Sequence, residues 1–291
     1  MAPPTFDLQS HSIHSDGALA PGQVVAAAAQ AGVELLALSD HDTAAGVPEA
    51  ERAAHDAGIG LITATEITSV FDGQQDVHVL GYLIDPEERV LVGTLERSRA
   101  SREQRARAMA DALRELGYTL DEQVLSQRAA QGKSIGRPHL AQAVVSHAAN
   151  RPRLEREGLL DPTAFLVAYL IEGKPAFRDR EAPTVPESIE LIHGAGGLAV
   201  WAHPFWDVKE PREVLDAIDR FRVAGLDGVE SFYVAHNREQ TELLVSRCAE
   251  LGLLSTGSSD FHGPEHHTFS RFRAFDLHGL EPNLGPIAEP R

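Results

Sequence analysis

The chain of 291 residues is long enough to form one large domain or two modest ones around a buried core. Hydrophobic residues make up 43% of it and charged residues 24%, as in ordinary globular proteins, and no run of about 18 apolar residues predicts a membrane-spanning helix. The single cysteine, Cys248, excludes an intrachain disulfide and a cysteine-based zinc site. Since the N-terminus lacks the pattern of a secretory signal, we expect a cytoplasmic protein that does not contact membranes.

The charge balance limits the possible partners. The chain has 26 Lys and Arg residues against 43 Asp and Glu residues, which gives a net charge of −17 at pH 7. Proteins that bind long nucleic acids usually carry basic surfaces, because neutralised phosphates supply much of their affinity. The composition therefore argues against stable binding of duplex nucleic acid. A small phosphorylated ligand is compatible with it, because bound divalent cations can dominate the local electrostatic field.

Strand and helix patterns alternate at the start of the chain. Apolar runs predict strands at 5–9, 34–39, 61–67 and 77–84. Alanine-rich or amphipathic segments with an early proline predict helices at 21–31 and 47–57. Such alternation is typical of βα units around a parallel sheet.

The pattern changes between residues 87 and 181, where helical periodicity dominates and an inserted helical subdomain is expected. Helices are predicted there at 90–117, 121–131, 138–149 and 161–171. The alternation returns over 182–280. It predicts helices at 186–194, 212–223 and 238–251 and strands at 198–202, 228–231 and 253–257. Three prolines after residue 280 predict a loose C-terminal tail at 281–291.

The pattern amounts to seven βα-type units, four before the insertion and three after it. This number is close to that of the eight-stranded (β/α) barrel, and it predicts an α/β barrel of seven strands formed by residues 1–86 and 182–280. An open, doubly wound sheet is the alternative. That fold would place a GxGxxG phosphate loop after the first strand, and the chain has no such motif there.

Histidines and carboxylates lie on the predicted strands or directly after them. Because the loops that follow barrel strands meet on one face, we expect these side chains to converge. Nitrogen and oxygen donors without a thiolate suit Mn²⁺, Fe²⁺ or Zn²⁺. The donors outnumber what one ion can use, which predicts a cluster of cations that share a carboxylate and act in phosphoryl transfer. They are Gln9, His11, Asp16, Asp40, His41, Asp42, Glu66, His78, His203, Glu230, Asp260 and His262.

Each of these residues also has a plainer interpretation. His78 lies in an apolar strand and could be a core histidine bonded to a backbone carbonyl. His11 could lie on a surface loop, and Glu66 could be an exposed strand carboxylate. At least one of Asp40 and Asp42 is expected to cap the following helix. Only the joint pattern favours a metal centre.

Six segments resemble the successive motifs of the polymerase and histidinol phosphatase (PHP) family of metal-dependent phosphoesterases. The resemblance spans nearly the whole chain, and the segments occur in the order of the family. The helical block also resembles the insertion of the PHP subgroup that hydrolyses nucleotide phosphates and short oligonucleotides. The segments are DLQSHSIHSDG at 7–17, LSDHDT at 38–43, the strand with Glu66, VHVLGY at 77–82, AHP at 202–204 and GSSDFH at 257–262.

The resemblance implies a distorted seven-stranded barrel that holds two to three divalent cations, with Mn²⁺ expected and Fe²⁺ or Zn²⁺ as alternatives. By position, Glu66 would bridge the first two ions and would also be catalytic, together with Asp260 and His41. Hydroxide formed from a water between two cations would attack phosphorus. The implied ligands are His11 and Asp260 for the first ion, His78 and His203 for the second, and Asp16, His41 and His262 for the third.

The first motif departs from the family pattern. The family usually reads His-x-His at this point, whereas this chain reads Gln9-Ser10-His11. An amide oxygen is a neutral and weaker donor than an imidazole for a borderline transition metal. We therefore hypothesise that the first ion keeps three side-chain ligands, with Gln9 as an additional one, and exchanges more readily.

Several residues are candidates for handling the substrate. His236 and Asp42 could donate a proton to the leaving group. Arg137 and His139 start a predicted helix, which is a natural anion site, and related nucleotide-cleaving proteins carry an arginine–histidine element here. The alternative is an incidental surface arginine. Further candidates are Lys174 and Arg178 for the phosphate, and Phe232 or Tyr233 for stacking on a base, although both rings could equally be packing residues.

The expected function is the hydrolysis of a phosphate ester in a small nucleotide. Nucleoside 3′,5′-bisphosphates and the 5′ ends of short oligonucleotides are the expected substrates, and the sequence leaves the oligomeric state open. A phosphatase for a small metabolite such as histidinol phosphate is the alternative, which the long insertion makes less attractive. A non-catalytic metal-binding or phosphate-binding module is the alternative of another class, because Gln9 could signal decay of the site.

Overall fold

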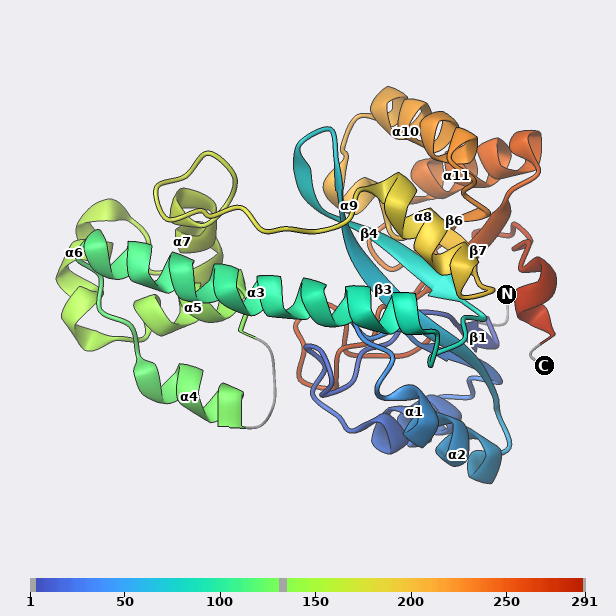
Figure 1. The fold of residues 1–291 in the computed structure, drawn as a ribbon, viewed down its shortest axis with the longest axis horizontal. Coiled ribbons are helices and arrows are strands. Elements are labelled where there is room, and N and C mark those ends of the chain that lie inside the picture. Colours follow the sequence, from blue (N-terminus) through green and yellow to red (C-terminus); the bar gives the residue numbers. More distant parts are fainter. Residues whose placement is uncertain (1–3, 131–134, 290–291) are drawn as a thin grey trace. The chain divides into compact units, whose positions relative to one another are not determined.

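The computed structural model describes residues 4–130 and 135–289, and the chain divides into two compact units (Figure 1). We call residues 1–96 and 182–291 the barrel unit and residues 97–181 the helical unit. The strands are β1 (Phe6–Asp7), β2 (Leu35–Leu38), β3 (Gly60–Phe71), β4 (Gln74–Tyr82), β5 (Leu198–Trp201), β6 (Gly228–Tyr233) and β7 (Leu254–Ser258).

The seven strands pair in the order of the sequence and form one nearly closed barrel. The two ends of the sheet meet through the backbone. The amide of Leu8 donates to the carbonyl of Gly257 at 3.2 Å, and the amide of His11 donates to the carbonyl of Phe261 at 2.8 Å. The prediction of an α/β barrel with seven strands is therefore confirmed.

The strand β4 departs from the predicted succession of βα units. It pairs antiparallel with both β3 and β5, whereas all other neighbouring strands are parallel. Asp72 and Gly73 connect β3 to β4, and both have positive φ angles, of 49° and 84°. A two-residue Asp-Gly turn favours a hairpin, and it is too short for the crossover that a parallel strand needs. The expectation of a separate βα unit at this point was wrong.

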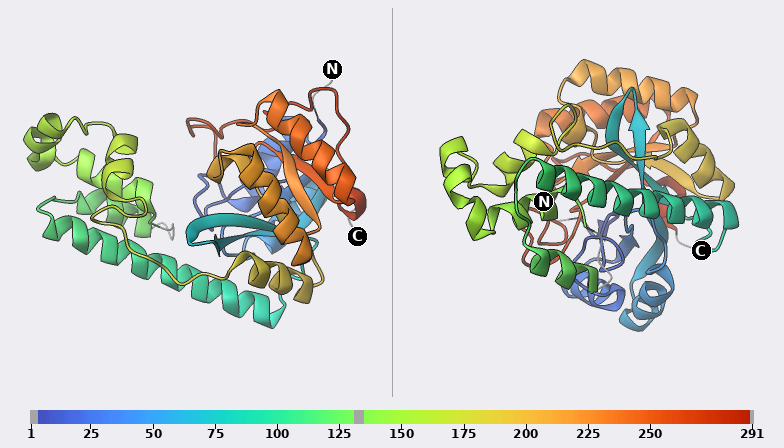
Figure 2. Two further views of the ribbon diagram at one scale, coloured as in Figure 1. Left: turned by 90° about the horizontal axis from the view of Figure 1, so that it is seen from above. Right: turned by 60° about the vertical axis from the view of Figure 1, so that its left-hand side comes forward.

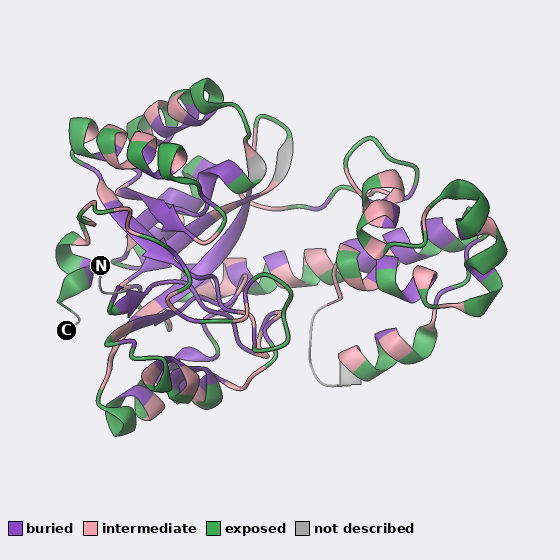
Figure 3. Ribbon diagram, turned by 180° about the vertical axis from the view of Figure 1, so that it is seen from behind, coloured by how far each residue is buried: buried purple, intermediate pink, exposed green. Residues whose placement is uncertain are grey.

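Apolar residues at alternate strand positions fill the interior of the barrel. The strands are buried along most of their length (Figure 3). Ala64 on β3 and Leu80 on β4 both belong to this apolar cluster. Because side chains two residues apart point to the same face of a strand, Glu66 and His78 also face the interior. The apolar layer consists of Phe6, Leu8, Ala37, Ile62, Ala64, Leu80, Tyr82, Val200, Ala202, Phe232, Phe275 and Ile287.

Helices cover the outside of the sheet. Ile192, Phe221 and Leu244 anchor α8, α10 and α11 on the outer face of the strands, and Figure 2 shows α10 and α11 in orange on that side. In the described part of the chain, no helix is long and apolar enough to cross a membrane. The helices of this unit are α1 (Pro21–Gln30), α2 (Val47–Ala57), α8 (Val185–Gly194), α9 (Pro204–Asp207), α10 (Pro211–Val223), α11 (Arg238–Leu251) and the 3₁₀ helix η2 (Gly285–Ala288).

The helical unit has an apolar core of its own, with Leu113, Leu140 and Phe165 among its buried residues. The predicted helix 138–149 is interrupted after Val145, and α6 was not predicted. The predicted helix 121–131 ends one residue outside the described range. The elements are α3 (Arg89–Glu115), which begins in the barrel unit, α4 (Glu122–Ala130), α5 (Arg137–Val145), the 3₁₀ helix η1 (Ala148–Asn150), α6 (Arg151–Glu157) and α7 (Pro162–Tyr169).

The C-terminal segment differs from the loose tail that its prolines predicted. Ile287 is fully buried in the apolar layer inside the barrel. The amide of Asn283 donates to Ser255 Oγ at 2.8 Å, and its side chain donates to the carbonyl of Leu253 at 3.2 Å. The described part of the tail, up to residue 289, thus packs on the barrel, with Leu284 against the same apolar layer as Ile287.

We expect Ile287→Ala to lower the free energy of unfolding by about 2–5 kcal/mol, as for other buried aliphatic side chains. Chemical denaturation followed by circular dichroism measures this change. Val223→Ala is the matched control, because Val223 is 89% exposed and its truncation should stay within about 0.5 kcal/mol. Equal unfolding midpoints for Ile287→Ala and the wild type would show that the tail adds no stability.

Candidate metal centre

The carboxylate of Glu66 lies at the centre of the polar end of the barrel and is fully buried. Its Oε1 atom lies 2.8 Å from His78 Nδ1 and 3.3 Å from His203 Nε2. Its Oε2 atom lies 3.2 Å from His11 Nε2 and 3.4 Å from His41 Nδ1. Each oxygen thus faces a different set of imidazoles, which is the arrangement that a carboxylate shared by two cations requires.

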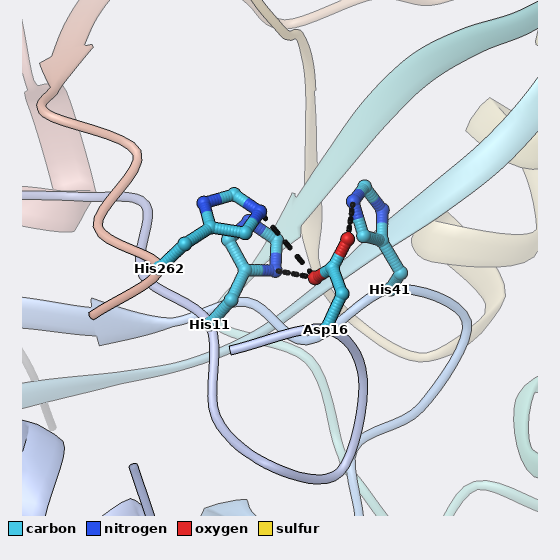
Figure 4. Close-up of side chains that lie close together, drawn as sticks. All are labelled: His11, Asp16, His41 and His262. Carbon is cyan, nitrogen blue, oxygen red and sulfur yellow. Dashed lines mark ion pairs between the residues drawn. The ribbon is translucent and has the colours of Figure 1, made fainter. Parts of the chain in front are cut away.

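Two further carboxylates complete the cluster. Asp260 Oδ1 lies 3.0 Å from His11 Nε2, beside Glu66. Asp16 Oδ1 lies 3.4 Å from His262 Nε2, and Asp16 Oδ2 lies 3.7 Å from His41 Nε2 (Figure 4). Three groups of side chains have donor atoms close enough to share one ion. They are His11, Glu66 and Asp260; His41, Glu66 and His78; and His11, Asp16, His41 and His262.

The donor atoms of this cluster fit divalent cations. His11 Nε2, His41 Nδ1 and Asp260 Oδ1 are buried, and none of them has a hydrogen bond of good geometry with the described residues. Buried polar atoms without such partners are costly, and a cation between them would satisfy their lone pairs. Imidazole nitrogens and carboxylate oxygens are the ligands of Mn²⁺, Fe²⁺ and Zn²⁺.

The imidazoles keep the central carboxylates ionised. Burial acts to raise the pKa of Glu66, but the interaction with the imidazoles around it outweighs burial and holds this pKa well below its ordinary value. Burial likewise opposes the charge of Asp260, yet His262 and His11 lower its pKa to about 2. Burial also lowers the pKa of His41 to about 3, so this ring is neutral at physiological pH and can act as a ligand.

Strained backbone holds two of the cluster residues in place. His203 and Asp260 have φ angles of 31° and 53°, in the left-handed region that residues other than glycine rarely adopt. Each lies two residues after the end of a strand, and its side chain contacts the cluster around Glu66. Strain of this kind persists only where the surrounding structure enforces it, and it is common at functional sites.

Buried carboxylates behind the cluster bind the backbone that carries it. Asp40 accepts hydrogen bonds from the Ser12 amide at 2.7 Å and from Ser15 Oγ at 2.6 Å. Asp42 accepts from the Thr68 amide at 2.9 Å. The expectation that Asp40 or Asp42 caps the next helix was wrong, because the N-cap of α2 is Gly46 and the two carboxylates bond to Ser12, Ser15 and Thr68 instead.

Asp7 and Tyr233 support the other side of the centre. Asp7 accepts from the Ser259 amide at 2.9 Å and from the Arg273 amide at 2.8 Å, and burial raises its pKa to about 7. The Tyr233 hydroxyl donates to Asp260 Oδ2 at 2.9 Å. Asp7 and Tyr233 thereby position Asp260. Tyr233 was considered only for base stacking, and no signal in the sequence indicated this bond.

Gln9 takes part in the centre through its amide N–H group. Its Nε2 atom donates to Glu66 Oε2 at 3.0 Å, whereas its Oε1 atom accepts from Ser258 Oγ at 3.3 Å. The oxygen is therefore turned toward Ser258. The prediction that Gln9 is a metal ligand does not agree with this geometry, because Oε1, the atom that could bind a cation, is hydrogen-bonded to Ser258.

Glu230 lies next to the centre but outside the three groups of donors. It accepts from the His203 amide at 2.9 Å and from Ser258 Oγ at 2.5 Å. Burial raises its pKa to about 8. Glu230 is thus largely protonated at neutral pH, and it holds the backbone of His203.

The proposed proton donor His236 is neutral. Its ring is 8% exposed, its Nδ1 atom lies 3.1 Å from the carbonyl of Ser231, and burial lowers its pKa to about 4. Nδ1 must carry the proton to bond a carbonyl, which leaves Nε2 as an acceptor. The prediction that His236 donates a proton to the leaving group was therefore wrong at neutral pH. Asp42, bonded to the Thr68 amide, is no better placed for this role.

The structure separates the residues predicted to bind substrate. Phe232 is fully buried in the apolar layer of the barrel, so its assignment to base stacking was wrong. The phosphate candidates all belong to the helical unit. Among them, His139 Nδ1 accepts from the Gly136 amide at 3.0 Å and so caps α5, and the Arg178 guanidinium donates to the carbonyls of Pro175 and Phe177. The other two candidates are Arg137 at the start of α5 and the exposed Lys174.

The chain is similar to known proteins over most of its length. Residues 7–140 match the model of the PHP domain. The chain is 35% identical over 259 residues to the 5′-3′ exoribonuclease of Haemophilus influenzae, covering 89% of this chain and 90% of that protein. It is 33% identical over 263 residues to the 3′,5′-nucleoside bisphosphate phosphatase of Chromobacterium violaceum, covering 89% of this chain and 87% of that protein.

A crystal structure shows the same similarity. A protein from Bifidobacterium adolescentis, described as a metal-dependent phosphoesterase, is 31% identical and superposes with a TM-score of 0.74, covering 92% of this chain and 91% of that one. The chain thus belongs to the PHP domain family, the phosphoric ester hydrolases that its motifs predicted.

Proposed function

We propose that the protein hydrolyses phosphate esters of small nucleotides, with nucleoside 3′,5′-bisphosphates and the 5′ ends of short oligonucleotides as its substrates. The main support is the geometry of Glu66, whose two oxygens face separate pairs of imidazoles 2.8–3.4 Å away. Two relatives over most of the chain are an exoribonuclease and a nucleoside bisphosphate phosphatase. The net charge of −17 favours a compact substrate over a long polymer.

We propose that two or three divalent cations bind, with Mn²⁺ as the expected metal. Glu66 would bridge two of them, with His11 and Asp260 on one side and His78 and His203 on the other. Cations held in this way acidify water and neutralise the charge that develops on a phosphoryl group. The ligands proposed for the third ion are Asp16, His41 and His262.

In this proposal the side chains of the protein position the cations and the substrate and form no covalent bond with the substrate. The buried carboxylates behind the centre fix the backbone of the ligands, and the barrel excludes water from its apolar side. His236 serves as an acceptor at the edge of the site. We further propose that polar residues of the helical unit bind the phosphate of the substrate, namely Arg137, His139, Lys174 and Arg178.

The first test is phosphate release from a panel of substrates with and without added Mn²⁺. We expect release from nucleoside 3′,5′-bisphosphates, and we expect Asp260→Asn and His41→Ala to lower kcat/KM by roughly two orders of magnitude or more. His55→Gln is the control, because this histidine is exposed on α2. Phosphate release from histidinol phosphate alone would contradict the proposed substrates and identify the protein as a phosphatase of small metabolites. No turnover by metal-loaded protein would favour a binding module.

The second test concerns the first cation. We expect Gln9→His to increase the number of cations retained during dialysis, because an imidazole would add a ligand where the amide presents its N–H group. Element-resolved analysis of the dialysed protein measures the content. Gln30→His adds the same side chain at an exposed position of α1 and should change nothing. Equal metal content in Gln9→His and the wild type would contradict a weakened first site.

The third test uses the pKa of His236. The unfolded chain takes up a proton near the ordinary pKa of 6.5, whereas the folded chain does so only near 4. Folding stability from this group is therefore complete above pH 6.5 and is lost as the pH falls toward 4, by at most about 1.4 kcal/mol per pH unit. We expect His236→Asn, which keeps a donor for Ser231, to lose less stability on acidification than the wild type.

Denaturation at several pH values with a chelator present measures this difference, since the other histidines contribute equally to both proteins. His55→Asn serves as the surface control and should follow the wild type. A parallel pH dependence of His236→Asn and the wild type would mean that His236 is not buried as a neutral ring.

A further inference from the structure

Beside the metal centre, three aromatic rings from separate segments of the barrel unit form a cluster. Trp206 lies in α9, Tyr233 ends β6, and Phe269 lies in the segment after β7. The ring centroids are 6.3 Å apart for Trp206 and Tyr233, 5.6 Å for Trp206 and Phe269, and 6.0 Å for Tyr233 and Phe269. Nothing in the proposed hydrolysis uses these rings except the bond from Tyr233 to Asp260.

The cluster is continuous with the metal ligands. The Tyr233 hydroxyl donates to Asp260, and the Phe269 ring lies 5.4 Å from the ring of His262. Trp206 follows the ligand His203 by three residues, and its amide donates to the carbonyl of His203 at 2.8 Å. Trp206 is thus separated from the cations' ligands by one ring only.

Trp206 differs from all other aromatic residues in its exposure. Its side chain is 46% exposed, whereas Tyr233 is 3% and Phe269 is 8% exposed. It is the one exposed aromatic side chain in the part of the chain that the structure describes. A rigid aromatic ring exposed beside a phosphate site is suited to stack on the base of a nucleotide.

The ring of Trp206 is also held in place. Lys209 Nζ donates to the backbone carbonyls of Phe205 and Trp206, and it lies 5.9 Å from the centroid of the Trp206 ring. The indole ring also packs near the rings of Tyr233 and Phe269, with 6.3 and 5.6 Å between centroids. A ring that is ordered before binding loses little conformational freedom when a ligand stacks on it.

We propose that the exposed face of Trp206 stacks on the base of a nucleotide whose phosphate lies at the metal centre. This inference rests on the proposed function and adds a base subsite to it. A single exposed ring is too small an area for a stable protein interface, whereas one nucleobase matches it. Stacking reads no hydrogen-bond pattern, so the subsite should accept all bases and favour the larger purines.

Fluorescence tests this contact without turnover, because the chain has only two tryptophans and the other, Trp201, is fully buried. With Mn²⁺ present, adenosine 5′-monophosphate should quench the emission of the wild type, and ribose 5-phosphate should not. The quenching should disappear in Trp206→Leu, which keeps Trp201. Equal quenching by both ligands, or quenching that persists in Trp206→Leu, would overturn the inference.

Kinetics then separate a base contact from a structural role. For Trp206→Leu we expect KM for adenosine 3′,5′-bisphosphate to rise on the order of tenfold or more while kcat changes little, as for the loss of one stacked base. Trp206→Phe should restore part of the affinity. Val223→Ala, another exposed apolar residue of the barrel unit, is the control.

The base-free substrate ribose 5-phosphate completes the design. If Trp206→Leu raises KM for the nucleotide and the sugar phosphate equally, Trp206 supports the metal centre and binds no base. If KM for the nucleotide stays at the wild-type value, the base subsite is wrong, while the hydrolytic function stands. If the metal-loaded wild type hydrolyses neither compound, the proposed function itself fails.

Discussion

The buried carboxylate of Glu66 is the group on which the polar end of the barrel depends. A lone ionised carboxylate in the interior would be very unfavourable, because it loses its hydration. Here four imidazoles and the amide of Gln9 surround it at 2.8–3.4 Å. The buried carboxylate is therefore stabilised by its imidazole neighbours, or by cations bound between them. Every strand of the barrel carries or precedes a residue of this cluster or a residue bonded to it.

The antiparallel hairpin β3–β4 places this polar cluster next to the apolar layer inside the barrel. Alternation along β3 and β4 places Ala64 and Leu80 in the core layer, and Glu66 and His78 one step further along the same face. A slip of one residue in the pairing would turn both polar side chains outward. The hydrophobic packing of the barrel and the geometry of the metal centre are thus set by one hydrogen-bonded register.

A second layer of polar groups explains why the ligands can occupy strained positions. Asp7, Asp40 and Glu230 each accept hydrogen bonds from backbone amides next to cluster residues. These bonds offset the cost of the left-handed backbone at His203 and Asp260. Residues that act through the backbone in this way make the site rigid, and rigidity is what positioning a phosphoryl group requires.

The sequence by itself determined the seven strands, the helical insertion and the set of side chains that meet at Glu66. Periodicity is a local property, and strand ends must converge in a closed sheet, so these features could be read from spacing alone. The Asp72-Gly73 turn also favours an antiparallel β4, a local signal that the spacing of the strands does not carry. The sequence did not determine that Ile287 fills the barrel. Nor did it reveal that Gln9 turns its N–H group to Glu66, that Phe232 is buried or that Trp206 is exposed. These outcomes depend on which atoms compete for one space or one hydrogen-bond partner, and only the tertiary structure brings those competitors together.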